Sequence, residues 1–490
     1  MNTVGYCWPQ SVLPGEPVAL HASGDGSSVD VEVVRDSGVV ATVWSAEGVA
    51  IDDLGLPATA DEDGCDWPAT LTIPTEASWQ SGLYLVRFRR APETNEVDPI
   101  TAFFVVRAAR PAASGCLLVL ATNTWNAYND FGGRNLYTGA ITPSFERPLS
   151  AGMLAKPEEH GERLVDGGRA YLEYTEAHGL SMWHGMAGWA GQERRFATWA
   201  DRAGIDVDFA TNADVEQQPD LLDGCRLYLS VGHDEYWSWA MRDALDRFVD
   251  DGGSVAFLSG NTCYWQVRIE GARMVCYKHR LVEDPVYGTA RQHLTTTIWS
   301  DPIVGRPETM LTGVTFTRGG YHRIARSARR GSGGYEVHRP DHWLLEGTGL
   351  ARGDLLGASS TTVGYECDGC DMAMRDGLPV ATGTGGTPAD FEVVATAPAT
   401  PFDNDTTPLP LAPGGAYELE FHAARLFGDS SPTNLERLRH GHAVLGSFER
   451  GGTIVTAGTT EWAYGLADPA VDRVTRNIIE RGTRVPRDHA

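Results

Sequence analysis

The sequence predicts an α/β protein, in which an N-terminal β-sandwich is followed by a mostly parallel, doubly wound sheet. The chain has 490 residues, more than a single hydrophobic core ordinarily accommodates, and this length favours two domains. Residues 1–110 read as short strands without a helical period, whereas apolar strands alternate with helical segments after Cys116. Hydrophobic residues make up 42% and charged residues 21%, a balance that excludes a disordered chain.

The first 110 residues have the pattern of an all-β domain. Val29–Arg35 alternates apolar and polar residues, as a half-buried strand does, and Gly82–Arg90 and Ile100–Arg107 have similar strand composition. Short strands separated by Gly and Pro turns favour a sandwich of immunoglobulin type. We therefore predict one domain at residues 1–110, a linker at Arg110–Gly115 and a second domain at residues 111–490.

The second domain begins with a strand that is apolar throughout, which predicts burial on both faces. Strand and helix patterns then alternate, so that the strands form a mostly parallel sheet covered on both sides. The expected strands are Cys116–Thr122, Asp206–Thr211, Arg226–Val231, Ser254–Leu258 and Gly452–Ala457. The expected helices are Gln192–Ala203, Trp239–Asp250 and Val471–Ile479. From about residue 280 the pattern is mixed and rich in loops, with Gly and Pro dense between residues 301 and 415.

Charge and composition exclude several classes of partner. Asp plus Glu is 65 and Lys plus Arg is 40, so the net charge is −25 and neither nucleic acid nor an anionic membrane is an expected partner. No apolar run approaches the ~18 residues of a membrane span, and no signal peptide is visible, so a cytoplasmic protein is expected. The eight cysteines should then be free thiols. Only Lys156 and Lys278 are lysines, a bias typical of a GC-rich bacterial gene.

Polar and aromatic side chains follow four of the predicted strands. In parallel sheets ligands bind at the carboxyl ends of the strands, so these residues should meet at one edge. We expect Asn123, His233, Glu235, Tyr236, Asn261 and Glu461 to line one pocket. Trp125, Tyr128 and Trp265 lie in the same loops.

Each of these residues also has a structural interpretation. His233 is as often a buried packing residue as a functional one, and asparagines commonly form turns. Cys367 and Cys370 have the spacing of a zinc or redox pair, but no second pair accompanies them. No Gly-x-Ser-x-Gly turn follows a strand, so a hydrolase of this kind would activate water with a carboxylate, a histidine or a metal.

The motifs resemble one known family. Gly232–Ser238, with the letters GHDEYWS, and Ser259–Trp265, SGNTCYW, are similar to the N,N-dimethylformamidase large (beta) subunit family. Asn123–Asn129 and the segment from Gly452 through Glu461 to Gly465 resemble it too. The resemblance covers roughly residues 111–490 and implies a glutamine-amidotransferase-like sheet with an N-terminal immunoglobulin-like domain.

The resemblance implies hydrolysis of a small linear amide to an amine and a carboxylic acid. It implies iron held by two tyrosines and a glutamate, of which Tyr236 matches one; Gly188–Asp201 has no tyrosine and His293–Trp299 no acid where the other two are expected. We assign catalytic roles to His233, Glu235, Asn261 and Glu461, substrate binding to Asn123, Trp125, Tyr128 and Trp265, and metal binding to Tyr236.

Two points stay open at this level. The rival hypothesis is a non-catalytic protein that binds a carbohydrate or another small ligand with Trp125, Trp237 and Trp265. The resemblance also leaves open whether the chain works as a homo-oligomer or with a small partner subunit.

Overall fold

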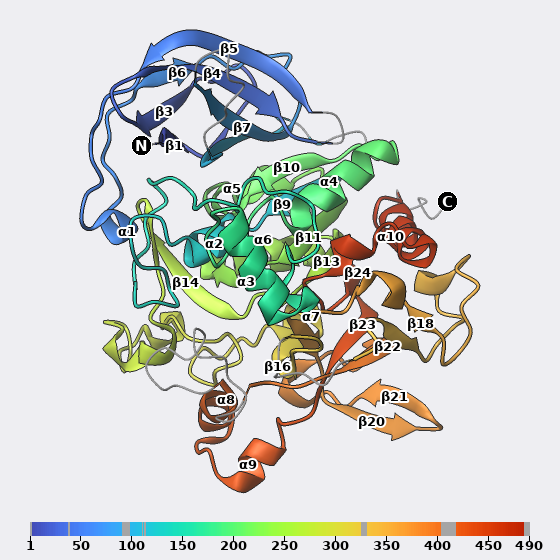
Figure 1. Cartoon of the computed structure of the whole chain (residues 1–490). Coiled ribbons are helices and arrows are strands. Elements are labelled where there is room, and N and C mark those ends of the chain that lie inside the picture. The colour runs from blue at the N-terminus through green and yellow to red at the C-terminus, as the bar shows by residue number, and fades with distance from the viewer. Residues whose placement is uncertain are drawn as a thin grey trace. The chain divides into compact units, whose positions relative to one another are not determined.

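A computed structural model describes residues 2–37, 40–90, 99–109, 111, 114–324, 331–402 and 418–484 (Figure 1). Arg110 and residues 112–113 lie outside the described residues, and with them half of the predicted linker and the boundary at residue 110. The chain divides into two compact units. Unit 1 contains residues 1–113, 117–218 and 268–276, and unit 2 contains residues 114–116, 219–267 and 277–490.

The N-terminal part of unit 1 is built from two sheets. One has the strand order β1-β3-β6 and the other β2-β8-β7-β4-β5. Only β2 and β8 pair in parallel, and the other pairs are antiparallel. The strands are β1 (Val4–Trp8), β2 (Ser11–Val12), β3 (Val18–Ser23), β4 (Ser28–Arg35), β5 (Ala41–Ala50), β6 (Leu71–Ile73), β7 (Gly82–Arg89) and β8 (Ala102–Val106). Side chains of both sheets form one apolar cluster, which includes Leu20, Val31 and Phe104. The immunoglobulin-like topology stays a prediction.

The remainder of unit 1 alternates strands and helices. Strand β10 (Asp208–Thr211) pairs in parallel with β9 (Cys116–Leu120). The predicted strand Cys116–Thr122 ends early, because α2 begins at Thr122. The helices are α1 (Ala60–Asp63), α2 (Thr122–Tyr128), α3 (Gly168–Ala177), α4 (Gln192–Arg202) and α5 (Asn212–Gln217), and β15 (Arg273–Val275) pairs with the end of β14 (Trp265–Glu270).

Unit 2 contains a mixed sheet with the order β11-β13-β24-β23-β22-β17-β18. Strands β11 (Leu227–His233), β13 (Ser254–Gly260) and β24 (Gly452–Thr456) are parallel to one another. From β24 to β23 (Gly441–Arg450) and onward the pairs are antiparallel. The prediction of a mostly parallel sheet was therefore too broad: Gly451 joins β23 to β24 in a tight turn, and such a short connection permits only antiparallel pairing.

The other elements of unit 2 lie around this sheet. The strands are β12 (Tyr236–Ser238), β16 (Thr315–Gly320), β17 (Tyr335–Val337), β18 (Leu355–Leu356), β19 (Cys367–Gly369), β20 (Met372–Arg375), β21 (Leu378–Ala381) and β22 (Glu392–Ala399). The helices are α6 (Trp239–Asp250), α7 (Thr309–Thr312), α8 (Glu418–Phe427), α9 (Pro432–Glu436) and α10 (Pro469–Gly482). In Figure 1, α8 and α9 lie side by side.

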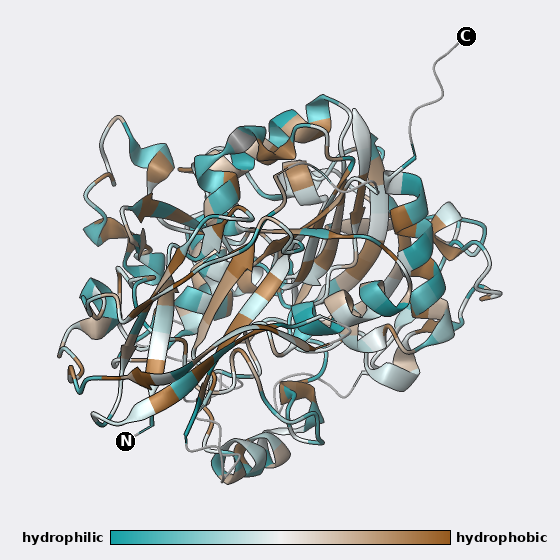
Figure 2. Ribbon diagram, turned by 90° about the horizontal axis from the view of Figure 1, so that it is seen from above, coloured by the Kyte–Doolittle hydropathy of each residue, from teal (hydrophilic) through white to brown (hydrophobic). Residues whose placement is uncertain are grey.

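Local sequence explains where the main helices begin and which face they bury. The Ser238 hydroxyl caps α6 by accepting a hydrogen bond from the Met241 backbone (3.1 Å), and Asp468 caps α10 in the same way. Both helices bury an apolar stripe. In Figure 2, helices carry both teal and brown segments, as amphipathic helices do. Among the described residues, no helix is long and apolar enough to cross a membrane. All eight cysteines are free thiols.

Candidate functional site

The site in unit 2 forms where two parallel strands end. In the register of β11 and β13, His233 lies opposite Gly260, so Asn261 follows at the same edge. This is the edge at which the sequence predicts the functional side chains. His233 and Asn261 are both buried.

His233 contacts two glutamates. Its Nε2 lies 2.7 Å from Glu366 Oε2 and 3.2 Å from Glu235 Oε2, and all three side chains are at most 4% exposed. Burial alone would lower the pKa of His233, but the charges and hydrogen bonds of Glu366 and Glu235 raise it well above its ordinary value. The imidazole is therefore held as a cation between two carboxylates.

Asn261 completes this group. Its Nδ2 donates a hydrogen bond to Glu366 Oε2 (3.2 Å), while its Oδ1 is buried and has no hydrogen-bond partner among the described residues. The backbone φ of Asn261 is +50°, a left-handed conformation that Asn tolerates better than most residues. The amide oxygen can accept a hydrogen bond from a bound molecule. We refer to His233, Glu235, Asn261 and Glu366 as the histidine–glutamate site.

Glu366 was not predicted from the sequence. It directly precedes the three-residue strand β19, in the region that reads as loops. The backbone of Thr460 donates to the Glu366 carbonyl (3.0 Å), and Thr459 donates to the Ser259 carbonyl at the end of β13 (3.0 Å). These contacts bring the loop of Glu461, which is itself buried, to the loop of Glu366.

Tyr236 and Trp265 lie opposite each other in the parallel pair β12–β14, and the Trp265 backbone donates to the Glu235 carbonyl (2.9 Å). Lys278 was noted in the sequence only for its rarity. It is buried, its Nζ donates to Tyr236 Oη (3.0 Å), and the same nitrogen lies 5.0 Å from the Trp265 ring centroid. An ammonium group therefore lies where the resemblance places a metal ion at Tyr236, and its charge opposes a second cation there.

The three predicted substrate-binding residues of the first loop lie in unit 1 and are buried. The Asn123 backbone donates to Asn212 Oδ1 (3.0 Å), and Trp125 Nε1 donates to Glu193 Oε2 (3.2 Å). Tyr128 Oη accepts a hydrogen bond from Tyr137 Oη (2.6 Å). These contacts fix all three residues within unit 1, where two phenol oxygens come together.

Further acids are buried in unit 2. Burial, together with the charges of Glu308 and Glu366, raises the pKa of Asp368 to about 8, against the hydrogen bond from the Thr262 backbone. Burial likewise raises the pKa of Glu418 to about 8 and that of Glu308 to about 7. Asp368 and Glu418 are therefore mostly protonated near pH 7 and Glu308 is protonated in part, in contrast to the charged His233.

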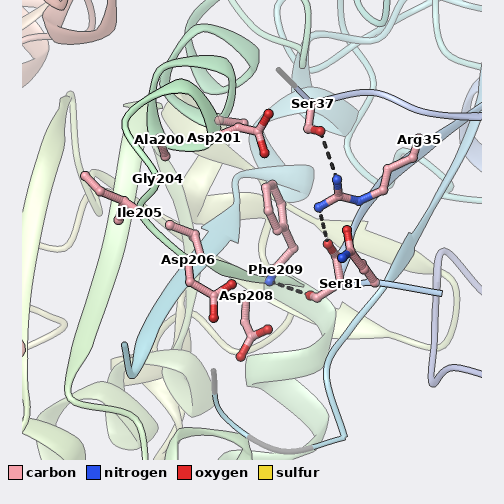
Figure 3. Close-up of a pocket in the computed structure, with 13 residues that line it drawn as sticks. Arg35, Ser37, Ser81, Ala200, Asp201, Gly204, Ile205, Asp206, Asp208 and Phe209 are labelled. Carbon is pink, nitrogen blue, oxygen red and sulfur yellow. Dashed lines mark hydrogen bonds between the residues drawn. The ribbon is translucent and has the colours of Figure 1, made fainter. Parts of the chain in front are cut away.

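Unit 1 contains two cavities, and none of the predicted site residues lines either of them. The first, of about 410 Å³, is shown in Figure 3. There the Arg35 guanidinium donates to the Ser37 hydroxyl and to the Ser81 carbonyl (2.9 Å each). The second has a volume of about 640 Å³.

Within the described ranges, no group of three or more His, Cys, Asp or Glu side chains could hold a metal ion. The two paired phenols of Tyr128 and Tyr137 have the oxygen chemistry that ferric iron prefers, whereas Lys278 donates to the oxygen of Tyr236. The tyrosine pair therefore fits iron better than Tyr236 does.

The fold and the site define a mixed α/β protein with a buried histidine–carboxylate group. The chain belongs to the family described as "N,N-dimethylformamidase beta subunit-like, C-terminal", which matches residues 33–476. The match therefore begins within the N-terminal sheets, well before residue 111, where the resemblance was expected to start.

Two relatives are named N,N-dimethylformamidase beta subunit. The chain is 26% identical to the one from Paracoccus aminophilus, over 85% of this chain and 54% of the relative. It is 25% identical to the one from Alcaligenes sp, over 64% of this chain and 43% of the relative. The chain thus spans about half the length of the relatives it matches.

Proposed function

We propose that the chain is an amide hydrolase that cleaves a small linear amide to an amine and a carboxylic acid. One observation carries the proposal: Glu366 lies within hydrogen-bonding distance of both His233 and Asn261 in a buried site. The family and the names of its relatives support the same reaction class.

The chemistry follows from the three side chains. Asn261 Oδ1 accepts a hydrogen bond from the attacking water, which orients it toward the amide carbonyl carbon. This water molecule attacks the carbonyl carbon and gives its proton to Glu366, acting as general base. The positive charge of His233 stabilises the oxygen that becomes negative. When the C–N bond breaks, the nitrogen takes the electron pair and the proton from Glu366, and the amine leaves.

Glu235 and Glu461 have supporting roles in this proposal. Glu235 is the second carboxylate beside His233 and helps to keep it charged. Glu461 follows Thr460, whose backbone bonds to Glu366, so it belongs to the loop that fixes the base. Trp265 and Tyr236 hold Lys278 in place, the first through its ring face and the second through its hydroxyl oxygen.

Iron belongs to this proposal as well. Tyr128 and Tyr137 would hold it through their phenol oxygens, and a ferric ion supplies Lewis-acid chemistry where it is bound. The earlier assignment to Tyr236 is the alternative, and metal analysis of tyrosine variants separates the two. The relatives are named as subunits, so we also propose that the chain acts with a partner subunit or as an oligomer, which its mass in solution tests.

The rival hypothesis of a carbohydrate-binding protein has less support. Carbohydrate binding needs exposed aromatic faces, but Trp125, Trp237 and Trp265 are at most 3% exposed. Their positions favour packing within the fold.

The deciding experiment is an amide screen on the purified full chain, with and without added iron. N,N-dimethylformamide and other short linear amides are incubated with the protein, and amine and acid are measured together. Equal amounts of both products are expected from at least one amide. If amides bind but release no amine under either condition, the chain is a binding protein.

A further inference from the structure

Helix α8 contacts the surroundings of the site through two polar side chains. His422 Nε2 lies 2.5 Å from Tyr264 Oη, and both side chains are buried. Burial, with a smaller contribution from nearby His279, lowers the pKa of His422 to about 3, so the imidazole is neutral. Burial raises the pKa of Tyr264 well above its ordinary value, so the phenol keeps its proton and donates a hydrogen bond to His422.

Glu418 makes the second contact, one turn earlier in the helix. Its Oε1 accepts a hydrogen bond from Tyr321 Oη (3.0 Å), and its Oε2 accepts one from the Phe402 backbone (2.9 Å). The Tyr321 ring stacks on Phe402 at 3.8 Å and lies 5.9 Å from the ring of Tyr365. Tyr365 precedes Glu366 and meets the His233 ring edge to face at 5.9 Å.

Both tyrosines are linked to the site by short paths. Tyr264 lies three residues after Asn261, and its backbone N–H donates to the Glu235 carbonyl (2.9 Å). A displacement of Tyr264 therefore moves the loop that orients Asn261 and Glu235. Tyr321 acts through Tyr365 on His233 and Glu366.

Helix α8 also has apolar contacts. Leu419 and Ala423 are buried in a cluster with Leu438 of the following segment. Burying His422 and Glu418 as well costs free energy unless each side chain is hydrogen-bonded. Their hydrogen bonds are directional contacts, which apolar packing lacks.

We propose that Glu418 and His422 are positioning residues of the histidine–glutamate site, which they orient through the hydroxyl groups of Tyr321 and Tyr264. This inference rests on the proposed amide hydrolysis. Neither side chain contacts His233 or Glu366 in any described hydrogen bond or ion pair, so both act through the tyrosines.

The test compares variants that keep or remove each acceptor. His422→Phe removes the acceptor but keeps an aromatic ring, and His422→Gln restores an acceptor. Glu418→Ala and Glu418→Gln form the same comparison. Glu436→Gln makes a matched change on an exposed side chain of α9.

His422→Phe and Glu418→Ala should lower kcat by about tenfold or more with little change in KM, because small misplacements of catalytic groups are costly. The Gln variants should recover most of the loss, and Glu436→Gln should behave as wild type. A kcat within twofold of wild type in both truncations, or a loss that Gln does not rescue, overturns the inference.

A second measurement separates this inference from the proposed function. Hydrogen–deuterium exchange of the peptide containing residues 261–265 needs no substrate, and His422→Phe should exchange faster there than His422→Gln. If the wild type cleaves no amide, the proposed function fails. If exchange in this loop is unchanged by His422→Phe, the positioning role fails independently.

Discussion

His233, Glu235 and Glu366 are three buried side chains whose charges depend on one another. A carboxylate buried alone would be strongly disfavoured, and so would an imidazolium. Together they form a compact group with one positive and two negative charges, and Asn261 adds a hydrogen bond to Glu366. Such a group is sensitive to the loss of any one charge.

Glu366→Gln removes the general base and keeps the size of the side chain. We expect kcat for amide hydrolysis to fall by at least about 100-fold, the usual contribution of a positioned base. The measurement is amine release under saturating substrate. Glu392→Gln, on an exposed glutamate of β22, is the control and should leave kcat unchanged. Full activity of Glu366→Gln would remove Glu366 from the mechanism.

The tyrosines give a prediction about iron. Tyr137→Phe breaks the pair with Tyr128, so it should abolish bound iron and any tyrosinate-to-iron colour, whereas Tyr236→Phe should keep both. Metal analysis and the visible spectrum of protein grown with iron provide the measurement. The opposite result, with iron lost only in Tyr236→Phe, would assign the metal to Tyr236 despite Lys278.

Sequence reasoning placed His233, Glu235 and Asn261 at one sheet edge, and the structure brings these three together. It missed Glu366, because a short strand within a loop-rich region has no periodicity and only three-dimensional contacts bring it to β13. Lys278 stands out in the sequence only because it is one of two lysines in an arginine-rich chain. That rarity gave no indication of its contact with Tyr236.

At the scale of elements, the site depends on how tightly the end of β13 packs. A Cβ atom on Gly260 would lie 2.5 Å from the Thr460 nitrogen and 2.6 Å from the Glu366 carbonyl oxygen. Both neighbours are backbone atoms and cannot move alone. The close approach of three chain segments therefore requires glycine at this position.

Gly260→Ala should destabilise the protein by about 1–3 kcal/mol, the usual cost of overpacking, and should displace the loop that carries Glu366. We expect a lower midpoint of urea unfolding together with a loss of kcat in the protein that remains folded. A variant with wild-type stability would mean that these segments are packed less closely than the structure shows.

The elements that the sequence predicts best are the parallel strands and the helices that alternate with them. Helix α6 spans Trp239–Asp250 as predicted, and α4, α10, β11, β13 and β24 lie within a few residues of their predicted ranges. The antiparallel strands β22 and β23 were not predicted, because their pairing is set by contacts distant in sequence. Helix α8 was missed too, since its segment was read as part of a loop-rich region.

At the scale of the whole molecule, the net charge depends on buried carboxyl groups whose pKa values the fold raises. The chain has a net charge of −25 with every acid ionised, yet Asp368, Glu308 and Glu418 are buried with raised pKa values. Each binds a proton more tightly in the folded state than in the unfolded state. His233 has a raised pKa as well, so it acts in the same direction.

Folding stability should therefore fall as the pH rises. A group whose pKa is raised on folding contributes stability below its unfolded value and loses it as the pH passes through the folded value. For Glu308, whose pKa is raised from 4.5 to about 7, we expect a loss of roughly 1–2 kcal/mol between pH 6 and pH 9.

Glu308→Gln cannot ionise, and its Oε1 can still accept the hydrogen bond from Thr315. The free energy of unfolding in urea, measured across this range, should decline less in Glu308→Gln than in wild type, while Glu436→Gln on the exposed surface should follow the wild-type curve. Parallel curves for wild type and Glu308→Gln would show that Glu308 is ionised in the folded protein at neutral pH, and that its burial is compensated by positive charge such as that of Arg242, which already lowers the pKa of this group.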